Sequence, residues 1–495
     1  ILIQSEKEGK TPEEYVEYWN KRDFEDFTAL NIKFDFFYKT SSQENKQFVQ
    51  DVFKKLEQAG HIYENEIIQF YCNTDKKFLP DRYVIGTCPY CKADDQYSDL
   101  CEKCGRVPEE IENPHCSICG QTPTKEKTKH YFFKLKNFSN QLSQYLENNQ
   151  NLQKDVKKYV QNWIKEGLTD WDITRDISWG IPIPVDGEKK KVFYGWFDNH
   201  LAYISSTIKF LNDSGKDGKK FWNDSDIYHF IGKDIVYHHY LFLPAMRLGI
   251  SEEYKLPDYI PTRGHLTLQS KKISKSRNWY IGLKDFLGIF PADYLRFYLI
   301  SINPYSQDDL NFNWDEFATK INSELIGNLG NLVNRALGFT LKSFDGVVPD
   351  PDEFDNMDKE SEKMIKEFVT ELSILMEKNH LDRALKMILQ FSAHFNQYFQ
   401  HKEPWKNGPG TNSCVFLSVN AVRSLAIAIY PFMPDSSQKI WVQLGLEGSV
   451  SAQMFDQISN ITLNQGHKLG SVSPLFEKVE ESVIDEQKSK LGDSN

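Results

Sequence analysis

The sequence predicts a mixed α/β fold, in which a domain built on a parallel sheet carries a cysteine-rich insertion and is followed by a bundle of α-helices. Strand-like apolar segments alternate with helical segments up to about residue 290, which is typical of parallel sheets. Three Cys-x2-Cys pairs interrupt this pattern between residues 88 and 119. After Pro291, apolar residues recur at helical spacing, as they do in a helical bundle.

The composition is that of an ordinary globular protein with room for roughly three domains. Hydrophobic residues make up 40% of the 495 residues, and the formal net charge is −11. An acidic chain does not bind nucleic acid through its bulk charge, so such binding would need a local patch. The sequence shows no recognisable signal peptide and no apolar run of about 18 residues. We therefore expect a cytoplasmic protein without a membrane span.

The amino-terminal part is predicted to be helical. Thr11-Pro12 marks a helix start, because Thr can cap a helix that has Pro at its first position. A second helix is expected over residues 42–59, where apolar residues share one face. Strand-like segments over residues 63–71 and 82–86 then lead into the cysteine region.

The cysteine region has the spacing of zinc knuckles. Two thiolates separated by two residues flank a tight turn, so both can bind one tetrahedral Zn²⁺. The pairs are Cys88-x2-Cys91, Cys101-x2-Cys104 and Cys116-x2-Cys119. Disulfides of a secreted protein are the alternative, but clustered cysteines without a signal peptide favour metal.

The first two cysteine pairs can complete one structural zinc site by themselves. The third pair needs further ligands to make a second site. Cys72 is the expected third ligand, and Asp75 is a candidate fourth, although a carboxylate is less usual in a structural site. Cys414 is far from the others in the chain and is expected to be a buried helix thiol.

Two further strands are expected in the second half of the α/β domain. Residues 191–198 are predicted to form a buried strand that leads into a helix, and residues 226–231 another that runs into Gly232 and Asp234. Ligands of parallel α/β sheets bind beyond the carboxyl ends of the strands. Trp196 and the two residues after the second strand are therefore expected at a ligand-binding edge.

The stretch 270–278, S-K-K-I-S-K-S-R-N, is predicted to be a basic loop. Its serines disfavour a helix interior. Lysine ammonium groups on a mobile loop can follow a polyphosphate whose charge moves during a reaction. A lysine-serine run is more often a solvated surface loop, and the order of its residues decides between the two interpretations.

The order of residues in this loop points to a known family. Lys272-Ile273-Ser274-Lys275-Ser276 resembles the KMSKS signature of class I aminoacyl-tRNA synthetases, with Ile in place of Met. With the cysteine pairs and the helical part, the chain is similar to methionyl-tRNA synthetases from Ile1 to about Glu480. Further blocks that carry the resemblance are Gly9-Lys-Thr-Pro12, Phe78-Leu-Pro-Asp-Arg-Tyr83, Trp171-Asp-Ile-Thr-Arg-Asp176 and Tyr228-His-Phe-Ile-Gly-Lys-Asp-Ile235.

This resemblance implies a Rossmann-like catalytic domain with a zinc-knuckle insertion and an α-helical anticodon-binding bundle. The expected parts are residues 1–62 for the remainder of the first half of the catalytic domain, 63–130 for the zinc-binding insertion, 131–285 for the second half with the KMSKS-like loop, 286–320 for a stem-contact linker, 321–470 for the bundle and 471–495 for a carboxyl-terminal tail.

The resemblance also implies the site residues. The methionine-binding residues would be Arg175, Trp196, Tyr203, Ile235 and His239. Aromatic faces suit a flexible thioether through sulfur–aromatic contacts. The ATP-binding residues would be Gly232, Asp234, Lys272, Ser274, Lys275 and Ser276. Lys272 and Lys275 would act as catalytic residues on the triphosphate, with Mg²⁺ accompanying the ATP. The alternatives are a core aromatic for Trp196, a satisfied imidazole for His239 and pairing with Lys233 for Asp234.

The sequence departs from the family pattern in several places. Asn199-His200 replaces a common Ala-Pro, and His238 and Leu243 stand where aromatic residues are common. No HIGH-type motif, whose histidines stabilise the ATP phosphates, is found in the sequence. The resemblance places it upstream of Ile1. We therefore expect residues 1–495 to adenylate methionine poorly and a chain that includes the motif to be active.

A second group of residues is expected to contact tRNA. Asn331 and Arg335 lie one helical turn apart, on a helix face that is predicted to point outward. Pro404 ends a later helix and leaves Trp405 at its end, where packing between helices is the alternative role. In the resembled family, an Asn, an Arg and a Pro-Trp at these positions contact the methionine anticodon, whose bases stack on aromatic rings.

The implied function is that of a methionine–tRNA ligase, with methionine, ATP and methionine tRNA as partners. It would form methionyl-adenylate and pass the methionyl group to the 3′ end of the tRNA. Other class I synthetases are disfavoured by the block that ends at Ile235 and by the compact insertion. A non-catalytic tRNA-binding or assembly protein derived from a synthetase is a second alternative. A zinc-ribbon nucleic-acid binder is a third, which the acidic charge disfavours.

Overall fold

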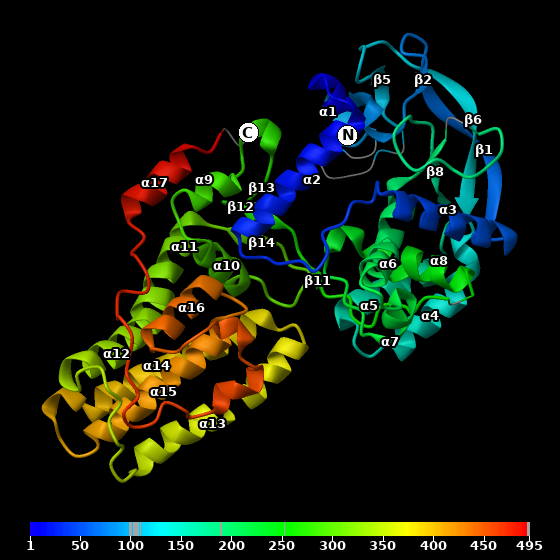
Figure 1. The fold of residues 1–495 in the computed structure, drawn as a ribbon. Helices are drawn as coiled ribbons and strands as arrows, with labels where there is room; N and C mark the ends of the chain where they lie inside the picture. The colour runs from blue at the N-terminus through cyan, green and yellow to red at the C-terminus, as the bar shows by residue number, and fades with distance from the viewer. Residues whose placement is uncertain (99–100, 102–107, 109, 189–190, 252, 493–495) are drawn as a thin grey trace. The chain divides into compact units, whose positions relative to one another are not determined.

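The computed structural model describes residues 1–98, 101, 108, 110–188, 191–251 and 253–492. The chain forms two compact units, whose elements Figure 1 labels. Unit 1 comprises Ile1–Phe24 and Phe34–Pro261, and unit 2 comprises Glu25–Lys33 and Thr262–Asn495. Each unit has its own hydrophobic core.

Unit 1 is the mixed α/β part of the chain. Its helices are α1 (Leu2–Lys7), α2 (Pro12–Ala29, whose last residues belong to unit 2), α3 (Gln43–Gln58), α4 (Ser139–Asn148), α5 (Lys154–Glu166), α6 (Gly195–Asp213), α7 (Gly218–Asp224) and α8 (Leu243–Gly249). Its strands are β1 (Ile62–Cys72), β2 (Lys77–Phe78), β3 (Val84–Thr87), β4 (Gln96–Tyr97), β5 (Glu112–Cys116), β6 (Thr124–Phe133), β7 (Trp171–Asp172), β8 (Thr174–Arg175), β9 (Val192–Phe193) and β10 (Ile231–Gly232).

A long antiparallel pair of strands, β1 and β6, dominates the strands of unit 1 (Figure 1). β2 pairs with the outer side of β1, and β7 with the outer side of β6, which gives the order β2-β1-β6-β7. The insertion adds a small sheet of order β4-β3-β5, and β8 pairs with β9. Tyr228 and Tyr259 form a parallel bridge.

Helix α3 shows how apolar periodicity builds the core of unit 1. Ser42 caps the helix, because its side chain accepts a hydrogen bond from the Asn45 amide. Val49, Val52 and Phe53 follow at the spacing of one helix face and are at most 2% exposed. The helix predicted over residues 42–59 is confirmed.

Two strands predicted in this unit are shorter than expected. The strand over residues 191–198 is limited to Val192–Phe193, and α6 already begins at Gly195. Trp196 therefore lies in the first turn of a helix rather than in a strand. The reason is that the residues from Phe197 to Ile204 bury their apolar side chains at helical spacing. In the segment 226–231, regular pairing is limited to β10, which begins at Ile231.

Unit 2 contains a three-stranded sheet and the helical bundle. The sheet has the order β13-β12-β14, in which β12 and β14 run parallel. The strands of this sheet are β12 (Leu266–Leu268), β13 (Lys271–Lys272) and β14 (Leu310–Phe312). A further strand of unit 2, β11 (Thr262–Arg263), is not part of it. The helices are α9 (Leu283–Leu287), α10 (Ala292–Ser301), α11 (Trp314–Lys320), α12 (Asn331–Ser343), α13 (Asn356–Glu377), α14 (Leu381–Lys402), α15 (Thr411–Ile429), α16 (Pro434–Gln443) and α17 (Glu481–Ser489).

The apolar stripes predicted after Pro291 form the core of unit 2. A π-helical segment, Ile321–Gly330, joins α11 to α12 and carries Leu325 and Leu329, both fully buried. Helix α15 is the one described helix that is long and apolar enough to cross a membrane. Its most apolar stretch of 18 residues is 94% buried inside the structure, as expected of a central bundle helix. The predicted order of an α/β part with a cysteine-rich insertion followed by a helical bundle is confirmed.

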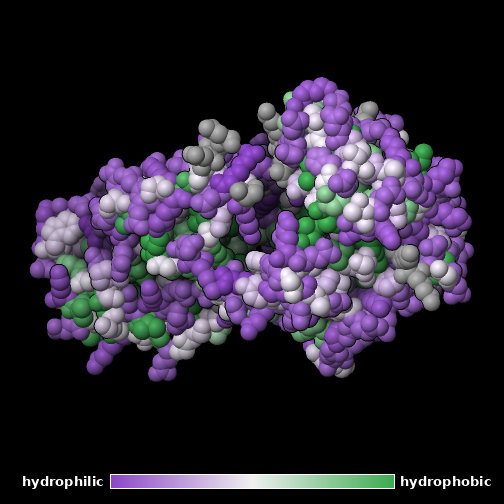
Figure 2. Space-filling view, turned by 90° about the horizontal axis from the view of Figure 1, so that it is seen from above, coloured by the Kyte–Doolittle hydropathy of each residue, from purple (hydrophilic) through white to green (hydrophobic). Residues whose placement is uncertain are grey.

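The visible surface is mostly hydrophilic. Figure 2 shows polar and charged residues over most of this face of each unit, with hydrophobic residues scattered among them. Scattered apolar residues are ordinary on protein surfaces.

Candidate active site and metal centres

A cluster of aromatic and histidine rings surrounds Trp196 in unit 1. Helix α6 carries Trp196, His200 and Tyr203 along one face. His238, the first residue of a π-helical turn (His238–Phe242), packs against the Trp196 ring. The Trp196 ring lies between two imidazoles, with ring centroids 4.2 Å from His238 and 5.5 Å from His200. Single π-turns are frequent at functional sites, because they re-aim side chains within a helix.

The hydrogen bonds of His239 fix the tautomer of its ring. Nδ1 lies 3.0 Å from the carbonyl oxygen of Ile235, which can only accept, so Nδ1 carries the proton. Nε2 is then the acceptor for the Tyr203 hydroxyl, 3.2 Å away. Ile235, Tyr203 and His239, three of the predicted methionine-binding residues, are therefore held together by a chain of hydrogen bonds.

The imidazoles of this cluster are uncharged near neutral pH. Burial lowers the pKa of His238 and of His239 to about 4, and that of His200 well below its ordinary value. Burial acts in the opposite direction on Asp198, whose pKa it raises to about 7. The imidazoles that surround Trp196 are therefore neutral aromatic rings, which suit an uncharged side chain.

Arg175, the predicted methionine-binding cation, lies in β8 and is mostly buried. Its guanidinium stacks over the Tyr194 ring at 3.8 Å. Its Nη1 donates to Asp172 Oδ2 at 3.2 Å and to the Thr174 carbonyl at 2.7 Å. Arg175 and Asp172 line a cavity of about 200 Å³ with Gln69 of β1. The guanidinium is thus held in one orientation beside a space large enough for a small polar group.

The predicted ribose-binding residues lie at the end of β10. Gly232 is its last residue, and Asp234 follows in a short helical turn and is exposed. A Cβ at position 232 would lie 2.5 Å from Asp234 Oδ1, so a larger residue there would displace the carboxylate. Glycine at this position therefore keeps the backbone and the carboxylate close together.

The lysine turn of unit 2, residues 270–278, begins as part of a hairpin rather than as a loop. Lys271 and Lys272 form β13, which pairs with β12 through a two-residue turn with positive φ at Gln269 and Ser270. Lys272 and Lys275 are exposed, and Ser274 is half-buried. The side chain of Ser276 lies outside the described set.

Backbone pairing holds the second half of the lysine turn. The amide of Ser274 donates to the Trp279 carbonyl, and the Trp279 amide donates back to the Ser274 carbonyl, both at 2.9 Å. The Trp279 indole is anchored in turn, since its Nε1 donates to the Leu268 carbonyl. Lys271 lies over the same indole at 5.1 Å. The lysine side chains therefore project from a backbone of fixed shape.

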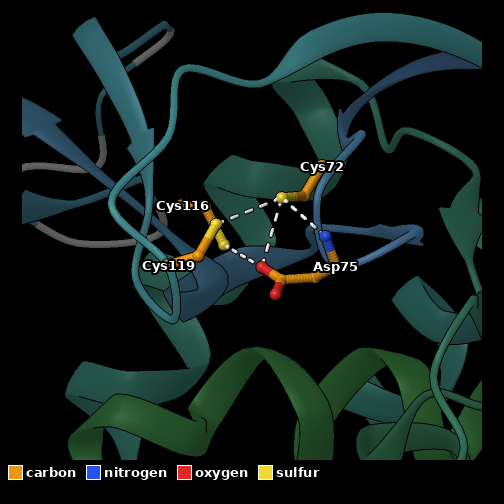
Figure 3. A group of neighbouring side chains, drawn as sticks. All are labelled: Cys72, Asp75, Cys116 and Cys119. Carbon is orange, nitrogen blue, oxygen red and sulfur yellow. Dashed lines mark hydrogen bonds between the residues drawn. The ribbon is translucent and has the colours of Figure 1, made fainter.

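The insertion of unit 1 brings two sets of metal-ligating atoms together. In the first, Cys88, Cys91 and Cys101 lie with all three sulfur atoms within 4.8 Å of one another. Cys104 lies outside the described residues. In the second set, the ligand atoms of Cys72, Asp75, Cys116 and Cys119 also lie within 4.8 Å of one another (Figure 3).

The second set has the arrangement of a four-coordinate site. Asp75 Oδ2 lies 3.1 Å from both Cys72 Sγ and Cys116 Sγ, and Cys72 Sγ lies 3.4 Å from Cys119 Sγ. The thiols of Cys119, Cys116 and Cys72 donate to the Asp75 carboxylate and lower its pKa. Three sulfurs and one oxygen at these separations match the donors and the tetrahedral geometry of Zn²⁺.

The predicted tRNA-contacting residues form a row in the bundle of unit 2. Arg335 lies over the Trp405 ring at 5.8 Å, and its Nη2 donates to Gln400 Oε1 at 2.7 Å. Asn331 Nδ2 donates to Asn396 Oδ1 at 2.8 Å. This face was expected to point outward, but Asn331 and Arg335 are half-buried against α14. Trp405 is 44% exposed, so one part of its ring is accessible.

Known protein families match the sequence of both units. The family model described as "tRNA synthetases class I (M)" matches residues 1–337, and "Anticodon binding domain of methionyl tRNA ligase" matches residues 348–495. A methionine–tRNA ligase of Methanopyrus kandleri is 41% identical over 502 residues, covering 99% of this chain and 74% of the relative. One of Thermococcus onnurineus is 39% identical, covering 98% of this chain and 68% of the relative. The chain belongs to the methionyl-tRNA synthetase family.

Solved structures agree with this family at the level of the fold. A methionyl-tRNA synthetase of Mycobacterium tuberculosis bound by methionyl-adenylate superposes with a TM-score of 0.76 and 22% identity, covering 96% of this chain and 89% of that chain. The free form of the Mycobacterium tuberculosis synthetase superposes with a TM-score of 0.74. The resemblance expected from the lysine turn is thus confirmed over nearly the whole chain.

The structure of this synthetase also reveals side chains that the sequence did not single out. His130 of β6 lies between Asp172 and Asp176, whose positions in the chain are more than 40 residues away. Local periodicity carries no signal for such a pairing, because it depends on which strands become neighbours. His200 and His238 stood out as departures from the family pattern, and the structure places both against Trp196.

Proposed function

We propose that this chain is a methionine–tRNA ligase that activates methionine with ATP and transfers the methionyl group to the 3′ end of methionine tRNA. The observation that carries this proposal is the match of relatives named methionine–tRNA ligase to 98–99% of the chain, at about 40% identity. A match across both units favours the enzyme over a non-catalytic tRNA-binding protein. Its place in the cytoplasm is part of the same proposal.

The neutral ring cluster would bind the methionine side chain. Trp196 and Tyr203 supply aromatic faces for the thioether, and Ile235 adds apolar surface. His239 is kept uncharged by burial, and its ring orientation is set by the Ile235 carbonyl. Arg175 would pair with the methionine carboxylate, because a guanidinium held in one orientation matches a planar carboxylate.

The lysine turn would bind the triphosphate of ATP. The methionine carboxylate attacks the α-phosphorus, the bond to the β-phosphate breaks and pyrophosphate leaves with the negative charge. Lys272 and Lys275 would follow that charge, while Ser274 and Ser276 would add hydroxyl donors. Gly232 and Asp234 would contact the ribose. Mg²⁺ bound with ATP would neutralise part of the phosphate charge.

The bundle would contact the anticodon. The exposed part of the Trp405 ring offers a stacking surface for a single-stranded base. Arg335 and Asn331 lie in the same row and present amide and guanidinium donors that can reach base edges. Methionine tRNA would then be selected in unit 2 and charged by the groups that bind methionine and ATP.

Zn²⁺ would hold the insertion together at two sites. The first would be formed by Cys88, Cys91, Cys101 and Cys104, and the second by Cys72, Cys116 and Cys119 with Asp75. Protein purified without chelator should contain roughly one to two zinc ions per chain. Asp75→Ala should remove one zinc ion, whereas Asp75→Cys should retain it. Folded protein without zinc would contradict the assignment.

Methionine-dependent exchange between ATP and pyrophosphate tests the activity. It should be measured with residues 1–495 and with the same chain extended upstream of Ile1 by a segment that supplies a HIGH-type motif. We expect exchange near background in the first and clear exchange in the second, with methionine preferred over isoleucine, valine, leucine and cysteine. A longer chain that exchanges with another of these amino acids instead would identify a different class I synthetase.

A further inference from the structure

A buried group of charges joins β6, β7 and β8 in unit 1, with His130 at its centre. The His130 side chain is fully buried. Its Nδ1 lies 2.8 Å from Asp172 Oδ2, and its Nε2 lies 3.0 Å from Asp176 Oδ2. Asp176 also accepts hydrogen bonds from Lys191 at 2.5 Å and from Thr128 at 2.8 Å. No part of this group belongs to the ring cluster around Trp196.

The partners of His130 require both of its ring nitrogens to be protonated. An ionised carboxylate only accepts hydrogen bonds, so each ring nitrogen that faces one must donate. The bonds to Asp172 and Asp176 oppose the effect of burial and raise the pKa of His130, and the bonds from His130, Lys191 and Thr128 lower the pKa of Asp176 to about 2. His130 is thus an imidazolium held between two carboxylates.

Asp172 connects this imidazolium to Arg175. The Oδ2 atom that accepts from His130 is the same atom that accepts from Arg175 Nη1. The other oxygen, Oδ1, accepts from the amide and the hydroxyl of Thr174. Asp172 therefore has no freedom to rotate away, and the guanidinium bonded to it is fixed as well.

The glutamates of β1 near His130 have partners of their own. Asn65 lies opposite His130, while Glu64 and Glu66 pair with Lys129 and Lys127 on the strand surface. Among the described residues, the carboxylates bonded to His130 are those of Asp172 and Asp176.

We propose that His130 is a positioning residue for the substrate carboxylate, acting through Asp172 on Arg175. The imidazolium is bonded to both carboxylates of the group, and through Asp172 it holds Arg175 in the orientation that would meet an incoming carboxylate. This inference rests on the proposed function, because it takes the carboxylate of methionine as the group that Arg175 binds. A low-dielectric setting strengthens the attraction between a guanidinium and a carboxylate.

The kinetic test compares matched variants in the chain that includes the HIGH-type motif. His130→Gln and Asp172→Asn should each raise the KM for methionine by about 10-fold or more, the scale of one charge-assisted hydrogen bond. The KM for ATP should change less than about 2-fold. Asp176→Asn should lower the melting temperature but change the KM for methionine much less, since it leaves the link from Asp172 to Arg175 intact. His401→Gln, an exposed histidine in α14, is the control.

A double mutant tests whether the effect passes through Arg175. In an Arg175→Gln background, His130→Gln should raise the KM for methionine no further, because residues that act in series are not additive. Equal effects of Asp172→Asn and Asp176→Asn on this KM would overturn the proposal, as would full additivity. The comparison of Asp172→Asn with Asp176→Asn tests the proposal even if His130→Gln does not fold.

Nuclear magnetic resonance of ¹⁵N-histidine-labelled residues 1–495 tests the charge of His130 without any activity. One imidazole should keep both ring protons at pH 8, and its signals should be missing from the His130→Gln spectrum. A singly protonated His130 at pH 7 would overturn the proposal. Because this measurement needs no substrate, it stays informative if methionine exchange fails, and that failure would count against the proposed function alone.

Discussion

The surroundings of Arg175 in unit 1 and the lysine turn in unit 2 hold their cations in opposite ways. The Arg175 side chain is 13% exposed and is fixed by Asp172 and by the ring of Tyr194. Lys272 and Lys275 are exposed, and regular pairing holds the backbone around them.

This difference would suit the two kinds of ligand that we propose for these residues. An amino-acid carboxylate has one binding geometry, so a rigid, desolvated guanidinium can be aligned in advance. A triphosphate changes shape and charge as pyrophosphate leaves, and exposed lysines can follow it without the cost of burying an ammonium group. Buried pairing should therefore govern binding of methionine, and the exposed lysines should govern the rate.

Lys275→Ala should have the largest effect and should act on rate alone. We expect a loss of about 10²-fold or more in methionine-dependent exchange, the usual scale for one transition-state charge contact. The melting temperature should not change, because Lys275 is exposed. The measurement is exchange at saturating ATP in the chain with the HIGH-type motif. Lys284→Ala, an exposed lysine in α9, is the control, and an equal loss in that variant would point to a general charge effect.

Trp405→Ala should have a smaller effect and should distinguish the role of unit 2 from that of unit 1. Loss of one stacked base predicts aminoacylation of methionine tRNA about 10- to 100-fold weaker, from roughly 1–3 kcal/mol per base. Methionine-dependent exchange should be unchanged, because that step does not involve tRNA. Trp405→Phe should retain much of the charging activity. If exchange and charging fall together in Trp405→Ala, the residue supports the bundle instead of contacting tRNA.

Much of the fold is predictable because it depends on local patterns. Helical spacing indicates the apolar faces of α3 and α12, and the spacing of the cysteine pairs marks the insertion. The order of residues in the lysine turn predicts its place in the chain, although Lys271 and Lys272 form a strand rather than a loop. These features need only near neighbours in the chain.

The rest depends on contacts between distant segments. His130 gives no local signal, since its two carboxylates come from a strand and a loop that follow α5. The strand expected over residues 191–198 ended early because core packing favoured a helix from Gly195. That change moved Trp196 and Asp198 from a strand end into a helix, and it decided what surrounds them. Periodicity alone does not distinguish a short buried strand from a buried helix start.

Asp198 contrasts with the paired carboxylate of Asp172 beside Arg175, and it gives the smallest expected effect. Burial raises its pKa to about 7 from an ordinary value of 3.8, and its Oδ1 has no hydrogen-bond partner among the described residues. Between these two values the unfolded chain releases the proton while the folded chain keeps it. The unfolded state then binds fewer protons, so the stability due to Asp198 falls as the pH rises from about 4 to about 7.

Asp198→Asn should remove this dependence, because an amide is neutral at every pH in the range. The free energy of unfolding of the variant, relative to the parent chain, should rise from pH 4 to pH 7 and then stay constant. We expect a gain of about 1–2 kcal/mol across this window, since water penetration and local relaxation reduce the cost of a buried charge. Denaturant unfolding at four pH values measures this difference in the free energy of unfolding. Only its change with pH is interpreted, because the amide of Asn also brings donors that need hydrogen-bond partners at every pH. A flat difference would show that Asp198 is already paired when ionised, and that the pairing seen around Arg175 extends to the start of α6.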